Sequence, residues 1–279
     1  MKNKKYTGII VPAITPLTKS LQIDIAGVEK LFSLLYNHQA VPFILGTTGE
    51  AASLSIQLKK NYIVAAAANK KPDTLLYAGI SSNVLEESIE MADFCALHQV
   101  DAVVATLPSY YALTDTQMLE YFVRLADSIS LPLFIYNIPA TTHMSIPINI
   151  VEELSRHKNI VGVKDSERNE DRMKACLKIS KDRNDFHYIL GWAAKSAEAL
   201  LLGADGLVPS TGNLYPDIYK KMLEAHTSGD EKTMYDMQKL SDTYGATYQK
   251  DRTLGESLYA LKLFMNEKNI CEPFVMPPL

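Results

Sequence analysis

The sequence predicts an α/β fold, a (β/α)8 TIM barrel with a C-terminal helical extension, and three observations lead to this class. Short apolar runs alternate with longer amphipathic segments over roughly the first three-quarters of the 279 residues. Such alternation is typical of parallel strands joined by right-handed crossovers, and eight repeats are the number that forms a (β/α)8 barrel. A hydrophobic content of 47% is enough for a full core.

The candidate strands are short, apolar and bounded by turn residues, as expected for strands of a buried parallel sheet. In chain order they are residues 7–15, 42–46, 74–79, 101–108, 131–137, 159–165, 186–191 and 205–210. Chemistry in this fold takes place at the carboxyl ends of the strands. The residues that end each run are therefore the first candidates for a site.

The candidate helices carry apolar residues at helical spacing. Those between the first five runs cover residues 24–38, 56–70, 83–98 and 114–128. The tail is longer than one helix needs and has a turn at "SGD", which predicts several helices there. We expect the barrel to occupy residues 1–213 and a helical extension, packed on the barrel, to occupy residues 214–279.

Composition narrows the function classes. The net charge is −4, and the only basic stretch is "KNKK" near the start, so nucleic acid is not expected as a partner. Cys95, Cys176 and Cys271 are far apart and form no C-x-x-C pair, which favours free thiols in a reducing compartment over a zinc site. The apolar start is interrupted by Pro12 and Pro16 and is interpreted as a strand, not a signal peptide. No run is long enough to span a membrane, so we expect a cytoplasmic protein.

Lys164 ends the apolar run "NIVGV", and a lysine in that place has two interpretations. If its side chain reaches water, it is an ordinary solvated lysine. If it does not, desolvation lowers its pKa and leaves a neutral amine that can form a Schiff base with a carbonyl. Tyr136 ends the neighbouring run "PLFIYN" and is either a packed tyrosine with one hydrogen bond or a proton shuttle beside the lysine.

Two further strand ends carry suggestive residues. The loop "GTTGE" combines two glycines with the hydroxyls of Thr47 and Thr48, and its backbone N–H groups could cradle a small carboxylate. The alternative is an ordinary strand–helix loop. Tyr110 and Tyr111 follow the fourth run and suit a subunit interface as well as a site. Because all these residues follow strands of one barrel, we expect them to converge.

These motifs, "GTTGE", the tyrosine of "YNIP" and the lysine of "GVKD", occur in an order and spacing that resembles the dihydrodipicolinate synthase / N-acetylneuraminate lyase family. The resemblance covers nearly the whole chain, including the helical tail. It implies a (β/α)8 barrel and class I aldolase chemistry on pyruvate, with no metal and no organic cofactor. It also implies a homotetramer built as a dimer of dimers.

The resemblance assigns roles to individual residues. Lys164 is the lysine that forms the Schiff base with pyruvate, and Tyr136 moves protons to and from the substrate. Thr47 and Thr48 hold the pyruvate carboxylate, with Thr48 also in the proton relay. Tyr110 matches the tyrosine that reaches into the neighbouring subunit's site.

Further positions concern the pocket wall and the second substrate. Gly191 and Val208 match residues that line the pyruvate pocket. "GVKDS" resembles members that cleave 2-keto-3-deoxy sugar acids, so Asp165 and Ser166 are expected to face substrate hydroxyls. The alternative for Asp165 is that it caps the following helix. His143 replaces a glycine usual in the family and is either a specificity residue or a loop histidine.

Departures from the family pattern bear on the substrate. Thr141 stands where dihydrodipicolinate synthases carry an arginine, so no bidentate fork is available there. Ala193 and Ala194 stand where neuraminate lyases place an acidic pair. Trp192 would narrow the pocket, which predicts a small or partly apolar aldehyde half.

The leading hypothesis is therefore a pyruvate-dependent aldolase that cleaves or forms a 2-keto-3-deoxy sugar acid, or a similar 4-hydroxy-2-keto acid, from pyruvate and an aldehyde. Four alternatives stay open. They are 4-hydroxy-tetrahydrodipicolinate (dihydrodipicolinate) synthase, N-acetylneuraminate lyase, a keto-deoxy sugar acid dehydratase, and a catalytically silent family member with a binding or regulatory role.

Overall fold

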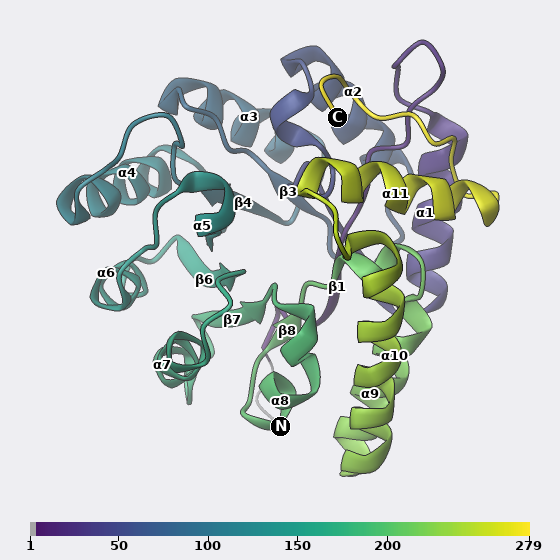
Figure 1. Cartoon of the computed structure of the whole chain (residues 1–279). Helices are drawn as coiled ribbons and strands as arrows, with labels where there is room; N and C mark the ends of the chain where they lie inside the picture. Colours follow the sequence, from purple (N-terminus) through teal and green to yellow (C-terminus); the bar gives the residue numbers. More distant parts are fainter. Residues whose placement is uncertain (1–3) are drawn as a thin grey trace. The chain divides into compact units, whose positions relative to one another are not determined.

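A computed structural model describes residues 4–279 of the chain. Within these residues eight parallel strands follow one another in the order β1 to β8 as a closed barrel. Helices alternate with the strands along the chain (Figure 1). The strands are β1 (Gly8–Pro12), β2 (Ala40–Ile44), β3 (Tyr77–Gly79), β4 (Ala102–Thr106), β5 (Leu133–Asn137), β6 (Ile160–Asp165), β7 (His187–Leu190) and β8 (Gly206–Leu207). Each overlaps one of the apolar runs, and the predicted (β/α)8 fold with a C-terminal helical extension is confirmed.

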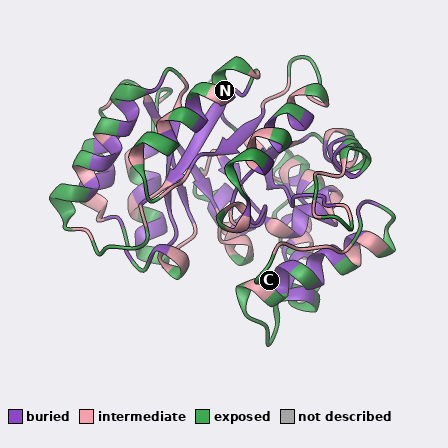
Figure 2. Cartoon of the chain, turned by 90° about the horizontal axis from the view of Figure 1, so that it is seen from above, coloured by how far each residue is buried: buried purple, intermediate pink, exposed green. Residues whose placement is uncertain are grey.

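The connecting elements are helices whose inner faces are buried and whose outer faces are exposed (Figure 2). The α-helices are α1 (Ile25–Asn37), α2 (Ile56–Ala68), α3 (Leu85–Leu97), α4 (Asp115–Ser128), α5 (Pro139–Thr142), α6 (Ile148–Leu154), α7 (Glu170–Ser180), α8 (Ser196–Leu201), α9 (Pro216–Ser228), α10 (Glu231–Gln249) and α11 (Leu254–Glu267). Short 3-10 helices occur at η1 (Ala51–Ser53), η2 (Ala193–Lys195) and η3 (Ser210–Asn213). No helix among residues 4–279 is both long enough and apolar enough to cross a lipid bilayer.

The chain forms two compact units. The first comprises residues 9–78 and 209–279, and the second comprises residues 4–8 and 79–208 of the described chain. The predicted division between residues 213 and 214 stays a prediction, and residues 1–3 of the predicted barrel range lie outside the described part.

In the second unit the parallel pairing of β5 with β6 sets the position of the site. Tyr136 lies opposite Lys164, and Asn137 lies opposite Asp165. Gly162 allows this pairing because a Cβ there would overlap the Phe134 ring of β5. The two strands therefore bring the tyrosine and the lysine side by side at their carboxyl ends.

In the first unit the helical tail takes the predicted form. Helix α9 ends at Ser228 and is capped by Gly229, whose φ of +75° lies in the left-handed region that glycine tolerates best. Helix α10 begins after Asp230, whose side chain accepts a hydrogen bond from the Thr233 N–H. Helix α11 begins with a capping box between Thr253 and Glu256. The "SGD" turn therefore separates two helices, as the sequence indicates.

A buried ion pair joins the tail of the first unit to the loop after β2. The carboxylate of Glu50 pairs with the amine of Lys262 on α11, and both side chains are 0% exposed. Lys262 Nζ also donates to the Phe274 carbonyl at 2.6 Å, and the Met276 N–H donates to Glu50 Oε2 at 2.7 Å. These bonds fix the end of the "GTTGE" loop against the C-terminal residues.

Replacing Lys262 with methionine tests this ion pair. The substitution leaves the Glu50 carboxylate buried without its cation, and we expect the free energy of unfolding to fall by about 3–5 kcal/mol. Urea denaturation followed by circular dichroism measures the change. Lys221→Met is the control, since Lys221 pairs with Asp217 through a side chain that is 60% exposed. The double variant Glu50→Gln/Lys262→Met should recover most of the loss, and equal costs for Lys262→Met and Lys221→Met would contradict the account.

Candidate active site

Lys164 is buried at the end of β6. Its side chain is 3% exposed, and its Nζ atom lies 3.8 Å from the centroid of the Tyr136 ring. Desolvation lowers the pKa of Lys164 below the ordinary lysine value of 10.5. The Tyr136 phenol acts in the opposite direction, through its charge and through a hydrogen bond, and raises this pKa by less. The residue is thus a desolvated lysine, and burial favours the neutral, nucleophilic form of its amine.

Ser166 connects the end of β6 to Tyr136. Its hydroxyl donates to the Tyr136 hydroxyl oxygen at 3.3 Å, and its backbone N–H donates to the Asn137 carbonyl at 2.9 Å. Gly191 leaves room for this arrangement, because a Cβ at that position would overlap the Ser166 hydroxyl. The structure therefore brings together four of the predicted site residues, Lys164, Tyr136, Ser166 and Gly191.

Gly191 and Val208 are held by backbone hydrogen bonds just past the ends of β7 and β8. The Gly191 N–H donates to the Asp165 carbonyl at 2.7 Å, and the Val208 N–H donates to the Leu190 carbonyl at 2.7 Å. Both residues therefore follow strand ends of the second unit. Their role in lining a pyruvate pocket stays a prediction.

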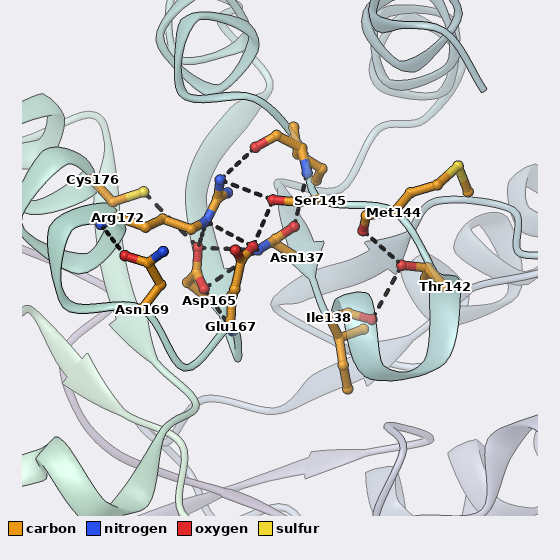
Figure 3. A network of polar contacts seen from close by, with 11 residues as sticks. Asn137, Ile138, Thr142, Met144, Ser145, Asp165, Glu167, Asn169, Arg172 and Cys176 are labelled. Carbon is orange, nitrogen blue, oxygen red and sulfur yellow. Dashed lines mark hydrogen bonds and ion pairs between the residues drawn. The ribbon is translucent and has the colours of Figure 1, made fainter. Parts of the chain in front are cut away.

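The carboxylate of Asp165 is engaged by protein groups (Figure 3). Its Oδ2 atom accepts from Arg172 Nε at 2.6 Å, and its Oδ1 atom accepts from the Glu167 N–H at 2.8 Å. Burial raises the pKa of Asp165, while Arg172 lowers it. These contacts weigh against the predicted role in binding substrate hydroxyls, which stays a prediction.

The alternative interpretation of Asp165 as a helix cap is wrong. Helix α7 begins at Glu170, and its N-cap is Asn169, whose side chain accepts from the Arg172 N–H at 3.0 Å. The carboxylate of Asp165 instead accepts the N–H of Glu167, two residues further along, which forms a local turn that precedes the helix.

The region after β5 carries two residues singled out by the sequence. Thr141 lies on α5, is partly buried, and its hydroxyl makes a long hydrogen bond to the Ile138 carbonyl at 3.4 Å. His143 follows α5 with a φ of +59°, the left-handed region that favours glycine. This conformation explains why glycine fits this position well. The histidine is accommodated there with its side chain exposed.

Tyr110 and Tyr111 lie in the loop after β4 and are 77% and 74% exposed. Their rings meet edge to face with centroids 4.9 Å apart. The Asn83 side chain accepts the Tyr110 N–H at 3.3 Å and so helps to fix the loop. The predicted role of Tyr110 at a neighbouring subunit's site stays a prediction.

Thr47 and Thr48 belong to the first unit, where they follow β2 in a tight loop. The Gly49 N–H donates to the Gly46 carbonyl at 3.0 Å, and Thr48 is buried while Thr47 is partly exposed. Glu50 ends the loop in a left-handed conformation with a φ of +56°. The ion pair of Glu50 with Lys262 holds this end of the loop.

Sequence reasoning missed the residues that surround Asp165, namely Asn137, Glu167 and Arg172. Asn137 follows Tyr136 directly, and Arg172 lies seven positions after Asp165. A buried-strand aspartate followed by an arginine on the next helix is a usable signal, because a carboxylate inside a barrel wall needs a cation. Among residues 4–279, no group of three or more His, Cys, Asp or Glu side chains is arranged to hold a metal ion.

Comparisons with known proteins give a consistent picture. Residues 5–252 match the model of the dihydrodipicolinate synthetase family. A 4-hydroxy-tetrahydrodipicolinate synthase of Campylobacter hominis is 30% identical over 273 residues, which cover 96% of this chain and 85% of that protein. A 4-hydroxy-tetrahydrodipicolinate synthase of Methanosarcina barkeri is 29% identical over 230 residues, which cover 82% of this chain and 78% of that protein.

Solved structures agree with this assignment. Dihydrodipicolinate synthase from Bacteroides thetaiotaomicron superimposes with a TM-score of 0.93 at 30% identity, covering 99% of this chain and 94% of that one. YagE of E. coli K12, a prophage protein of the dihydrodipicolinic acid synthase family solved in complex with pyruvate, gives a TM-score of 0.92 at 25% identity, covering 98% and 92%. The resemblance inferred from the three sequence motifs is confirmed. The chain belongs to the dihydrodipicolinate synthetase family and is a lyase of the class I, pyruvate-dependent aldolase type.

Proposed function

We propose that Lys164 forms an imine with pyruvate and that the enzyme cleaves or forms a 2-keto-3-deoxy sugar acid, or a similar 4-hydroxy-2-keto acid. The observation that carries this proposal is the buried amine of Lys164, 3.8 Å from the centroid of the Tyr136 ring. The pyruvate complex of YagE, a relative at 25% identity, supports pyruvate as the keto acid.

The chemistry follows from a neutral amine in a desolvated place. The amine attacks the keto carbon, and the hydroxyl of the resulting carbinolamine leaves as water with the proton of Tyr136. This step gives a protonated imine, which draws electrons from the adjacent carbon, and leaves Tyr136 as the phenolate. In the cleavage direction Tyr136 accepts the proton of the 4-hydroxyl, and the bond between C3 and C4 breaks. An aldehyde leaves, the enamine takes up a proton at C3, and hydrolysis of the imine releases pyruvate and restores Lys164.

The remaining residues have supporting roles in this proposal. The Ser166 hydroxyl donates to the Tyr136 oxygen, so it stabilises the negative charge that develops there when Tyr136 gives up its proton. The family resemblance is the support for assigning Thr47 and Thr48 to the carboxylate of pyruvate and Thr48 to the proton relay. Gly191 and Val208 line the pocket.

We also propose a cytoplasmic homotetramer, a dimer of dimers in which Tyr110 contributes to the neighbouring subunit's site. The exposure of the adjacent Tyr110 and Tyr111 rings supports an interface at this loop.

The second substrate is the aldehyde half. Thr141 offers a hydroxyl and no guanidinium fork, which disfavours an aldehyde that carries its own carboxylate. Trp192 follows β7 and is partly buried, with Lys195 Nζ 5.7 Å from its ring centroid. In this proposal its ring supplies an apolar wall next to the aldehyde. These features favour a small or partly apolar aldehyde.

The names of several relatives support a second candidate, 4-hydroxy-tetrahydrodipicolinate synthase. It shares the same imine of pyruvate and differs only in the second substrate. The two candidates are therefore separated by the aldehyde that the enamine accepts.

Substituting Lys164 with arginine tests the imine. Arginine has no nucleophilic amine at ordinary pH, so borohydride reduction in the presence of pyruvate should leave no adduct at residue 164. Peptide mass spectrometry locates adducts in the wild type and the variant. Lys158→Arg, at an exposed lysine just before β6, is the control and should trap pyruvate normally. An adduct that persists in Lys164→Arg, or one spread over surface lysines in the wild type, would contradict the proposal.

An aldehyde panel with pyruvate tests the substrate class. We expect small or partly apolar aldehydes to give at least tenfold higher kcat/KM than the second substrate of 4-hydroxy-tetrahydrodipicolinate synthases, a difference of about 1.4 kcal/mol in transition-state binding. A dehydrogenase-coupled assay of pyruvate release from the corresponding 4-hydroxy-2-keto acids measures the same preference in reverse. A strong preference for N-acetylmannosamine, or for the synthase substrate, would overturn the assignment of the aldehyde half.

A further inference from the structure

We propose that Arg172 is a positioning residue for the imine-forming site, where its guanidinium, with Asp165 and Asn137, clamps the carboxyl ends of β5 and β6. The clamp keeps Lys164 and Tyr136 in their relative places. This inference rests on the proposed function, because it concerns the geometry of the same two side chains.

The clamp acts on the residues next to the reacting pair. Asn137 follows Tyr136 on β5, Asp165 follows Lys164 on β6, and the two pairs lie opposite each other in the parallel ladder. Because side chains alternate along a strand, Asp165 and Asn137 point to the side opposite to Lys164 and Tyr136. The Asn137 amide donates to Asp165 Oδ2 at 3.3 Å, so the clamp joins the two strands on that side.

Arg172 brings a third segment into the clamp (Figure 3). Its Nε atom donates to Asp165 Oδ2 at 2.6 Å, and its Nη1 atom donates to the Ile146 carbonyl at 2.6 Å. The Ile146 N–H in turn donates to Asn137 Oδ1 at 2.9 Å. Both backbone polar groups of Ile146 are thus tied to the clamp, which fixes the segment that follows Thr141 and His143.

Glu167 extends the clamp to the loop after β6. Its Oε2 atom accepts from the Ser145 hydroxyl at 2.6 Å and from the Asn137 amide at 3.0 Å. Arg172 Nε lies 3.5 Å from the same oxygen. The loop between Asp165 and Glu167 carries Ser166, whose hydroxyl bonds to Tyr136. The clamp therefore holds the loop whose Ser166 hydroxyl contacts Tyr136.

A buried ion pair is weak evidence for stability, since well-packed apolar side chains often stabilise a core equally well. What a guanidinium adds is a planar fork that bonds two acceptors at fixed angles, here a carboxylate and a carbonyl. Such a fork fixes the positions of the groups that it bonds, which is what a positioning residue must do. The same ion pair neutralises a carboxylate that directly follows the reacting lysine.

Loss of the guanidinium has a predictable effect on Lys164. The ends of β5 and β6 loosen, water reaches the amine, and the Asp165 carboxylate loses its cation. Lys164 faces the Tyr136 phenol of β5. Asp165 faces Arg172 and Cys176 of α7, Tyr188 of β7 and the loop that carries Glu167. Hydration and the unpaired carboxylate both favour the protonated amine, so the reactivity of Lys164 near neutral pH should fall.

The test is reductive methylation of Lys164 by formaldehyde and cyanoborohydride, followed by mass spectrometry across a pH series. It needs no natural substrate. The wild-type rate should rise with pH, because only the neutral amine reacts, and its midpoint should lie below the ordinary lysine value of 10.5. Arg172→Met should move the midpoint up by about one pH unit, which is a roughly tenfold slower reaction near neutral pH.

Two variants serve as matched comparisons. Arg172→Lys restores a cation without the fork and should fall between the wild type and Arg172→Met. Arg156→Met removes an arginine that is 63% exposed and pairs with Glu152 and Glu153 on the surface, so its profile should match the wild type. A folded Arg172→Met protein with a wild-type profile would overturn the positioning role.

If Arg172→Met does not fold, the double variant Asp165→Asn/Arg172→Gln replaces it, because it leaves no unpaired buried charge. Slower methylation in this variant supports positioning by the clamp, and a wild-type profile overturns it. Borohydride trapping with pyruvate runs in parallel on all proteins. If the methylation midpoint of wild-type Lys164 lies below 10.5 but the residue takes no pyruvate, the proposed function fails. The shift in the Arg172 variants then still decides the inference.

Discussion

The exclusion of water from the amine of Lys164 is the constraint on which the rest of the site depends. An ammonium group in a buried place loses hydration that its neighbours only partly replace, so burial shifts its protonation equilibrium toward the neutral form. The strand before it can be wholly apolar because both faces of a barrel strand are covered. Gly162 then allows β5 to approach closely, and this puts Tyr136 beside the amine.

Two buried ion pairs, one in each unit, fix the strand-end loops that carry the candidate site residues. In the second unit, Asp165 and Arg172 join the end of β6 to α7. In the first unit, Glu50 and Lys262 join the loop after β2 to α11 and the C-terminal residues. A buried charge without its partner costs free energy, so each pair stabilises the fold only when its two side chains are held in contact. In each unit a helix, α7 or α11, thus holds a loop that follows a strand, and that loop carries candidate site residues.

The fold and the juxtaposition of Lys164 with Tyr136 were predictable from the sequence because both leave local patterns. Eight apolar runs alternate with amphipathic helices, and a lysine and a tyrosine end two neighbouring runs. The environment of Asp165 leaves a weaker signal, because its partners come from three segments, β5, the loop after β6 and α7. Spacing made Asp165 a candidate cap, but Asn169 lies closer to the start of α7 and takes that role. The link from Glu50 to Lys262 joins distant parts of the sequence and has no local signature.

The most direct measurement of the central claim is a crystal structure of the protein soaked with pyruvate. The account predicts continuous electron density from Nζ of Lys164 to the C2 atom of pyruvate, with the Tyr136 hydroxyl within hydrogen-bonding distance of the adduct. Pyruvate bound without a covalent link, or a covalent link at another lysine, would contradict the claim that the desolvated amine of Lys164 is the nucleophile.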